Sequence, residues 1–175
     1  MLFRSFGSVV KILLRFRRMW WADQGGQDLA DLSFLHTDAP VPTWWTQHPA
    51  TQPVLTGWYP QSKPERAALS EDDFVDLGLE SLAETFSVPM DELRRELVAS
   101  QAINWKDDPF ARGAYSYATP RTGEAQSLLS QPDGSAIFFC GEALYAGPDI
   151  GTVEAALASG RQAARMILAT CGNRG

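Results

Sequence analysis

The chain has 175 residues, of which 45% are hydrophobic and 21% charged, and its formal net charge is −6. This composition is typical of a globular protein with a buried core, and the acidic balance argues against a nucleic-acid partner. The cysteines, Cys140 and Cys171, and the histidines, His36 and His48, are too few and too scattered to predict a disulfide framework or a metal site.

The N-terminal apolar stretch does not have the form of a secretion signal. Val9–Leu14 is interrupted by Lys11, is followed by basic residues and leads to no small-residue cleavage site. No apolar run approaches the length that crosses a membrane. We therefore expect a cytoplasmic protein with no membrane partner.

Short apolar segments in the first third of the chain predict a sheet. Ser8–Phe16 is rich in β-branched and aliphatic residues and predicts a strand, with a helix as the alternative. Leu32–His36 and Val54–Tyr59 predict two more strands. Residues 40–45 read as an irregular aromatic segment, and Pro60–Glu65 as a loop. Short strands separated by turn residues indicate an antiparallel or mixed sheet.

Two helices are predicted in the middle of the chain. Ser70 is followed by three acidic residues and is typical of a helix N-cap, so we expect a helix from there to about Phe86. Pro89–Leu97 predicts a second, shorter helix. Ala102–Trp105 then predicts a strand, and Gly113–Ala118 a short extended segment, before a polar loop.

The last part of the chain predicts a strand that leads into a helix. Ile137–Phe139 reads as a buried strand, Cys140 as a small buried residue, and Gly151-Thr152 as the start of a helix. A helix N-terminus has unpaired N–H groups and a dipole that favours negative charge, so α/β proteins often bind anionic cofactors there. This geometry alone is generic.

Three segments carry a more specific signal. They are FGSVVK at 6–11, NWKDDPFARGAYSY at 104–117, and FFCGEA with GTVEAALASG between 138 and 160. In this order they resemble FAD-dependent amine oxidases of the monoamine and polyamine oxidase group. The resemblance covers nearly the whole chain but only the last part of the family's domain plan.

The resemblance implies an α/β (α+β) fold. A mixed sheet with helices, part of the substrate-binding domain, would occupy residues 1–118. The closing strand and helix of the FAD-binding domain would occupy residues 119–175. The implied reaction is oxidation of an amine's C–N bond to an imine, with oxygen as the electron acceptor.

The resemblance also implies residues for the substrate site. In these enzymes a lysine at the position of Lys11 hydrogen-bonds a water beside the flavin, although Lys11 taken alone would be an exposed strand lysine. Trp105 would flank the site and Tyr115 would form one wall of an aromatic cage, where core packing is the ordinary alternative. Lys11 and Tyr115 are the catalytic candidates. Thr152 occupies the second wall. Ala114 replaces a cysteine that tethers the flavin in some members, so non-covalent FAD is implied.

The cofactor contacts implied by the resemblance lie in the last segment. Glu142 would contact the ribityl and pyrophosphate region, and the N–H of Val153 would point at the flavin ring. Gly141, Gly151 and Thr152 belong to the same turns. The helix N-terminus would stabilise negative charge on the reduced flavin.

The glycine-rich loop that cradles the FAD pyrophosphate in this family is a G-x-G-x-x-G motif, and this sequence has none. We therefore expect a C-terminal portion, without the N-terminal Rossmann half, that binds FAD poorly by itself. It would act on a small-molecule amine that the sequence does not identify.

Two alternatives stay open. The chain could be a non-catalytic or partner-dependent subunit that binds a chain carrying the G-x-G-x-x-G half, or that self-associates through apolar surface. It could instead be a piece of a desaturase or protoporphyrinogen-oxidase type of flavoprotein, which acts on C–C bonds. The Lys11 strand and the tract with Trp105 and Tyr115 favour amine chemistry.

Overall fold

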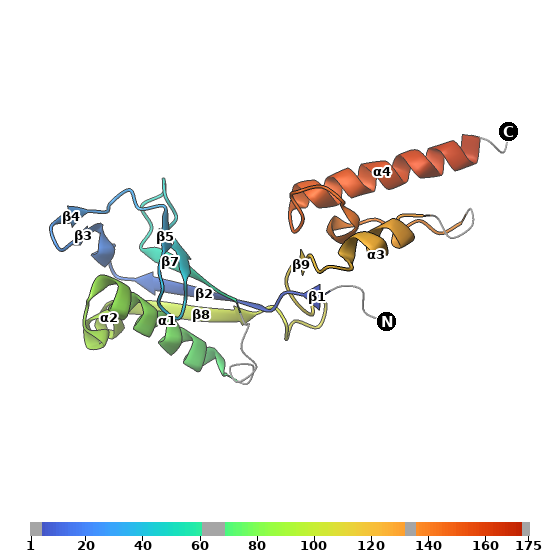
Figure 1. Ribbon diagram of the computed structural model, residues 1–175. Helices are drawn as coiled ribbons and strands as arrows, with labels where there is room; N and C mark the ends of the chain where they lie inside the picture. Colours follow the sequence, from blue (N-terminus) through green and yellow to red (C-terminus); the bar gives the residue numbers. More distant parts are fainter. Residues whose placement is uncertain (1–4, 61–68, 132–135, 173–175) are drawn as a thin grey trace. The chain divides into compact units, whose positions relative to one another are not determined.

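The computed structural model describes residues 5–60, 69–131 and 136–172 (Figure 1). Most of the loop predicted at 60–65 lies outside the described residues. By internal contacts the chain divides into two compact units. The sheet unit is Ser8–Gly113, and the helical unit combines Met1–Gly7 with Ala114–Gly175. Their assignment to a substrate-binding and an FAD-binding domain stays a prediction.

An antiparallel sheet of five strands forms the centre of the sheet unit. Its strands, in spatial order, are β5 (Phe34–His36), β6 (Thr43–Trp45), β7 (Val54–Pro60), β2 (Val9–Phe16) and β8 (Leu97–Asn104). The predicted α/β class is confirmed, and the described strand pairs of this sheet are all antiparallel.

The strand predictions for β2, β5 and β7 are confirmed, and β8 begins five residues earlier than the predicted Ala102. The irregular segment predicted at 40–45 is wrong in its second half, which is β6. Pro40 and Pro42 precede that strand, so they do not interrupt its ladder, and Thr and Trp suit a pleated surface.

Short elements extend the sheet unit beyond β2. A 3-10 turn, η1 (Trp20–Ala22), is followed by the hairpin of β3 (Asp23–Gln24) and β4 (Gln27–Asp28). Gly25 and Gly26 connect the two strands with φ of 59° and 80°. A two-residue turn with both φ values positive favours glycine.

Helices α1 (Glu71–Phe86) and α2 (Met90–Glu96) confirm the two helix predictions. Ser70 caps α1 in a capping box: its hydroxyl accepts from the N–H of Asp73 at 3.2 Å, and its own N–H donates to the Asp73 carboxylate at 2.8 Å. The Ser70 hydroxyl also donates to that carboxylate at 2.7 Å, and these hydrogen bonds lower the pKa of Asp73. The helix ends at Ser87, which has a left-handed φ of 54°.

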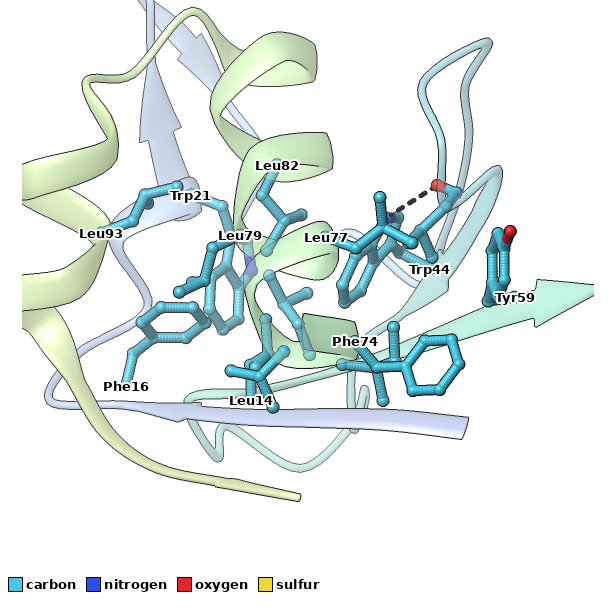
Figure 2. Close-up of a cluster of buried hydrophobic side chains, with 14 of the residues drawn as sticks. Leu14, Phe16, Trp21, Trp44, Tyr59, Phe74, Leu77, Leu79, Leu82 and Leu93 are labelled. Carbon is cyan, nitrogen blue, oxygen red and sulfur yellow. Dashed lines mark hydrogen bonds between the residues drawn. The ribbon is translucent and has the colours of Figure 1, made fainter. Parts of the chain in front are cut away.

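The core of the sheet unit lies between the sheet and α1 (Figure 2). Alternate residues of β2, including Leu14 and Phe16, are fully buried and meet Phe74 and Leu82 of α1. Trp44 is also fully buried, and its indole N–H donates to the Val41 carbonyl at 3.1 Å. Burying each such side chain stabilises the fold by roughly 1.5–3 kcal/mol.

The helical unit contains short elements and one long helix. They are β1 (Ser5–Phe6) paired with β9 (Ser116–Tyr117), α3 (Thr122–Leu129), η3 (Glu142–Leu144) and α4 (Val153–Gly172). The predicted helix after Gly151-Thr152 is confirmed by α4. Helix α3 falls where a polar loop was expected. It has no side-chain cap, and its buried Gln126 side chain holds it by donating to the carbonyl of Tyr145 at 2.7 Å.

The buried strand predicted at Ile137–Phe139 is wrong. Ile137 makes one isolated bridge, and Ile137 and Phe139 are each 49% exposed. Cys140 is exposed rather than buried. Beyond the Ile137 bridge, no described strand runs beside this segment, so its apolar side chains have no sheet to pack in. Among the described helices, none is long and apolar enough to cross a membrane.

Candidate functional site

Lys11 lies on the face of the sheet opposite the α1 core. Val10, Ile12 and Leu14 point into the core, and the alternation of a strand turns Lys11 the other way. In the ladder, Lys11 faces Trp58 of β7 and Ile103 of β8. We call this surface the Lys11 face and define it by Lys11, Trp45, Trp58 and Ile103.

The ammonium group of Lys11 lies beside a row of aromatic rings on the Lys11 face. The Lys11 ammonium lies 5.8 Å from the ring centroid of Trp45. The rings of Trp45 and Trp58 are 6.2 Å apart, and Phe34 lies 6.3 Å from Trp45. Such a cation–π contact contributes about 0.5–1 kcal/mol at an exposed site. The predicted contact of Lys11 with a water stays a prediction.

Trp45 and Trp58 are residues that the sequence did not single out. Trp58 lies on a predicted strand and Trp45 on β6. Once the register of these strands is known, both side chains fall on the same face of the sheet as Lys11. The register itself follows from strand pairing across residues distant in the chain. It could not be read from local patterns.

Trp105 directly follows β8 and is half-buried. Its N–H donates to the Val9 carbonyl at 3.2 Å, and its carbonyl accepts from the N–H of Gly113 at 2.9 Å. Between these residues, the Asp108 carboxylate accepts from the N–H groups of Phe110 and Ala111. Trp105 therefore closes an ordered turn in the same unit as Lys11.

Tyr115 belongs to the helical unit and lies against Gly151. A Cβ atom at position 151 would lie 3.0 Å from Cδ2 of the Tyr115 ring. Gly151 has a left-handed φ of 83° and directly precedes the cap of α4. The ring is 48% exposed, so this contact leaves much of it accessible.

Glu142 is engaged by Ser116, the neighbour of Tyr115. The backbone N–H of Ser116 donates to one carboxylate oxygen of Glu142 at 2.7 Å. The Ser116 hydroxyl lies 2.9 and 2.8 Å from the two oxygens. Ser116 is buried in this arrangement, with 3% of its surface exposed. In this structure Glu142 fixes the start of β9, which directly follows Tyr115, and its contact with a cofactor stays a prediction.

Thr152 is the N-cap of α4. Its hydroxyl accepts from the N–H of Ala155 at 3.1 Å and donates to the Asp149 carbonyl at 2.7 Å. The Thr152 carbonyl accepts from the N–H of Ala156 at 3.3 Å. The hydroxyl is thus committed to the helix end, and only the rest of the side chain could serve as a cage wall.

Val153 and Gly141 complete the candidate cofactor residues. None of the described residues supplies an acceptor for the N–H of Val153, whose side chain is 71% exposed. The N–H of Gly141 donates to the Ser159 hydroxyl of α4 at 3.2 Å, and its φ of 147° favours glycine. This tie holds the turn before η3 against α4.

Within each unit, the structure brings several candidates together. The helical unit joins Tyr115 to Gly151 directly and to Glu142 through Ser116. The sheet unit holds Lys11 on β2 and Trp105 directly after the neighbouring strand β8. The two catalytic candidates, Lys11 and Tyr115, belong to different units.

Comparisons with known proteins agree on the family. Residues 3–168 match the family described as flavin containing amine oxidoreductase. The chain is 30% identical over 170 residues to lysine-specific histone demethylase 1 homolog 3 of Arabidopsis thaliana, covering 93% of this chain and 10% of that protein.

A solved structure shares the fold. Cyclohexylamine oxidase from Brevibacterium oxydans IH-35A superposes with a TM-score of 0.71 at 21% identity, over 95% of this chain and 36% of that chain. The chain thus spans about a tenth of the curated relative and about a third of the solved one. With nearly all of its length matched, the chain belongs to the flavin containing amine oxidoreductase family.

Proposed function

We propose that the chain is the C-terminal portion of an FAD-dependent amine oxidase, which converts the C–N bond of an amine to an imine with oxygen as the electron acceptor. The observation that carries the proposal is the packing of Tyr115 against Gly151 at the capped start of α4. It joins the predicted substrate wall to the predicted cofactor turn. The names of both relatives concern amines, a cyclohexylamine oxidase and a lysine-specific demethylase.

The residues around the start of α4 fit the flavin that the family uses. The N–H of Val153, which has no described acceptor, is a donor for a ring carbonyl, and the helix dipole favours negative charge there. Gly141 and Gly151 have positive φ and keep the backbone of this region free of side chains. Glu142 and Thr152 are the other proposed holders. FAD, when bound, supplies the two-electron acceptor.

The chain's own side chains would bind and orient the amine. The accessible part of the Tyr115 ring offers an apolar body and a negative face for a neutral amine with an apolar substituent. Trp105, which lies in the sheet unit, keeps its proposed role as a residue that flanks the substrate. Lys11 would hold a water with its ammonium group, with the Trp45 ring beside it and Trp58 opposite it in the ladder. Ala114 has no thiol, so the cofactor would be held without a covalent bond.

A second candidate function follows from the surface of α4. Val153, Leu157 and Leu168 are each at least 60% exposed. Such apolar surface favours a partner-dependent subunit, which needs a chain carrying the G-x-G-x-x-G half, or self-association. The desaturase or protoporphyrinogen-oxidase type is the alternative for C–C chemistry, and the Lys11 strand and the tract with Trp105 and Tyr115 favour amine chemistry over it.

The proposal is tested by mixing the purified chain with FAD, alone and together with the G-x-G-x-x-G half of cyclohexylamine oxidase as a separate polypeptide. Cyclohexylamine, benzylamine and a lysine-containing peptide are added without oxygen, and flavin absorbance is followed. We expect bleaching by an amine in the complemented mixture and peroxide when oxygen is admitted. Stable FAD binding without reduction by any amine would favour the non-catalytic subunit.

A further inference from the structure

Tyr115 has little freedom in its backbone. Its carbonyl accepts from the N–H of Gly7 at 3.0 Å, and the N–H of Ala114 donates to the Gly7 carbonyl at 2.8 Å. On the other side, the N–H of Ser116 donates to Glu142 at 2.7 Å. Because the main chain is held before and after Tyr115, the ring can respond to its surroundings only through its side-chain torsions.

Gly151 is a neighbour that limits those torsions. A Cβ atom at position 151 would lie 3.0 Å from Cδ2, 3.4 Å from Cγ and 3.6 Å from Cβ of Tyr115. The shortest of these is tighter than ordinary van der Waals contact, and it involves the ring rather than a flexible chain end. The ring therefore occupies space that is available only because residue 151 has no side chain.

Gly151 cannot move away easily either. The next residue, Thr152, is bonded to Asp149 on one side and to Ala155 on the other, so the backbone at 151 is tied to the start of α4. The φ of 83° at Gly151 belongs to the region that side chains disfavour. The Tyr115 ring therefore lies between two fixed segments of backbone, its own and that of Gly151.

We propose that Gly151 is a specificity-determining residue, which sets the position of the Tyr115 ring and thereby the size of the amine that fits beside it. The claim about amine size rests on the proposed function. The claim about the ring position rests on contacts within the helical unit. A side chain at 151 turns the ring about its torsions toward its accessible side. That movement narrows the space for a bulky substituent and affects a small amine less.

The first experiment measures the ring itself. The full chain is labelled with ¹³C in its tyrosine rings, and the Tyr115 signal is identified with Tyr115→Phe. In Gly151→Ala we expect the Tyr115 signal to shift, while the signal of Tyr59, buried in the sheet unit, stays in place. An unchanged Tyr115 signal overturns the proposal.

The chain offers a matched control for backbone strain. Gly26 has a φ of 80°, close to that of Gly151, and no described atom lies within 4 Å of a Cβ atom placed there. Gly26→Ala therefore adds the same methyl group at the same kind of backbone without pressing on a ring. A Tyr115 shift of equal size in Gly26→Ala also contradicts the proposal.

A second measurement covers the case in which Gly151→Ala disturbs the helical unit. Hydrogen exchange at the N–H of Ala155, which Thr152 caps, reports the start of α4. We expect exchange there to be about tenfold faster in Gly151→Ala, and the acceleration to be smaller in a Tyr115→Ala background, where the added methyl has room and only the backbone strain at a φ of 83° remains. Equal acceleration in both backgrounds would mean that the ring is not involved.

The amine claim is tested in the FAD-loaded, complemented mixture described above. We expect Gly151→Ala to lower the kcat/KM for benzylamine relative to propylamine by about tenfold, and Gly26→Ala to leave that ratio unchanged. A shifted ring with an unchanged ratio overturns the specificity role. Absence of amine oxidation by the unmodified chain contradicts the proposed function, and the ring measurements still decide whether Gly151 positions Tyr115.

Discussion

The two units bury different kinds of side chain. The sheet unit closes a core of large residues, among them Trp21, Trp44, Phe16 and Phe74, all 2% exposed or less. In the helical unit, the most buried positions of α4 are Ala155, Ser159 and Ala163. Many of its large apolar side chains are exposed instead, among them Tyr115, Tyr117, Leu128, Leu129, Ile137, Phe139, Val153, Leu157, Ile167 and Leu168.

This contrast shows where the stability of the chain resides. The sheet unit removes most of its large apolar side chains from water by itself, with Phe34, Val98 and Phe110 as exposed exceptions. Such burial is the main source of folding free energy. The helical unit packs small residues closely and leaves its large ones available. We infer that the helical unit gains much of its stability when a partner chain covers that apolar surface. This agrees with the partner-dependent subunit proposed above as the second candidate function.

The largest expected effect is a core truncation in the sheet unit. Leu14→Ala removes a fully buried side chain that meets α1, and we expect it to lower the free energy of unfolding by about 2–5 kcal/mol. Leu168→Ala, at a position 71% exposed on α4, is the matched control and should change it by less than about 0.5 kcal/mol. Urea unfolding measures both. Equal losses would mean that the two units do not differ as described.

A smaller effect is expected at the cap of α1. Ser70→Ala removes the hydroxyl that accepts from the N–H of Asp73 and should cost about 0.5–2 kcal/mol in urea unfolding at neutral pH. Ser130→Ala is the control, since Ser130 follows α3 in the other unit and its side chain makes no hydrogen bond to another described residue. A neutral Ser70→Ala would contradict the capping box.

The pH dependence of the same cap has a definite sign. Hydrogen bonds from the hydroxyl and the N–H of Ser70 lower the pKa of Asp73 from its ordinary value of 3.8. A carboxyl group with a lowered folded pKa stabilises the fold above its unfolded pKa, and that contribution is lost as the pH falls through the folded pKa. Asp73→Asn should therefore weaken the acid dependence of unfolding below about pH 4. Identical acid titrations of the two proteins would exclude this role.

The smallest effect on stability is expected on the exposed face of α4, where the effect on association should be clearest. Leu157→Glu replaces a side chain that is 60% exposed, so the free energy of unfolding should change by less than about 0.5 kcal/mol. It should reduce binding of a hydrophobic dye and any self-association, seen by sedimentation. Ser127→Glu, also exposed and on α3, is the control. Unchanged dye binding would show that this face is not the apolar surface.

Local patterns predicted the elements that carry their own signals. The capped start of α1 at Ser70, the proline before α2 and the aliphatic run of β2 are each decided within a few residues. Local patterns failed for elements whose formation depends on contacts with distant segments. Helix α3 depends on Gln126 bonding to a distant segment, and β6 depends on its pairing with β7.

The candidate site divides in the same way. The motif around Tyr115, Glu142 and Gly151 could be named from the sequence because its residue types and order are distinctive. The bond between Ser116 and Glu142 and the contact of Gly151 with the Tyr115 ring depend on folding that joins residues 26 and 36 positions apart, which local patterns do not encode. The prediction of a buried strand at Ile137–Phe139 was wrong, because an apolar pattern does not show whether other strands lie beside the segment.

One measurement addresses the central claim most directly. Flavin absorbance is followed without oxygen in the chain complemented with the G-x-G-x-x-G half of cyclohexylamine oxidase, with Tyr115→Ala beside the unmodified chain and Tyr59→Phe as a control in the sheet unit. We predict bleaching by benzylamine that is at least about tenfold slower in Tyr115→Ala and unchanged in Tyr59→Phe. A bound flavin that no amine reduces, or one that is reduced equally fast in Tyr115→Ala, would contradict the account.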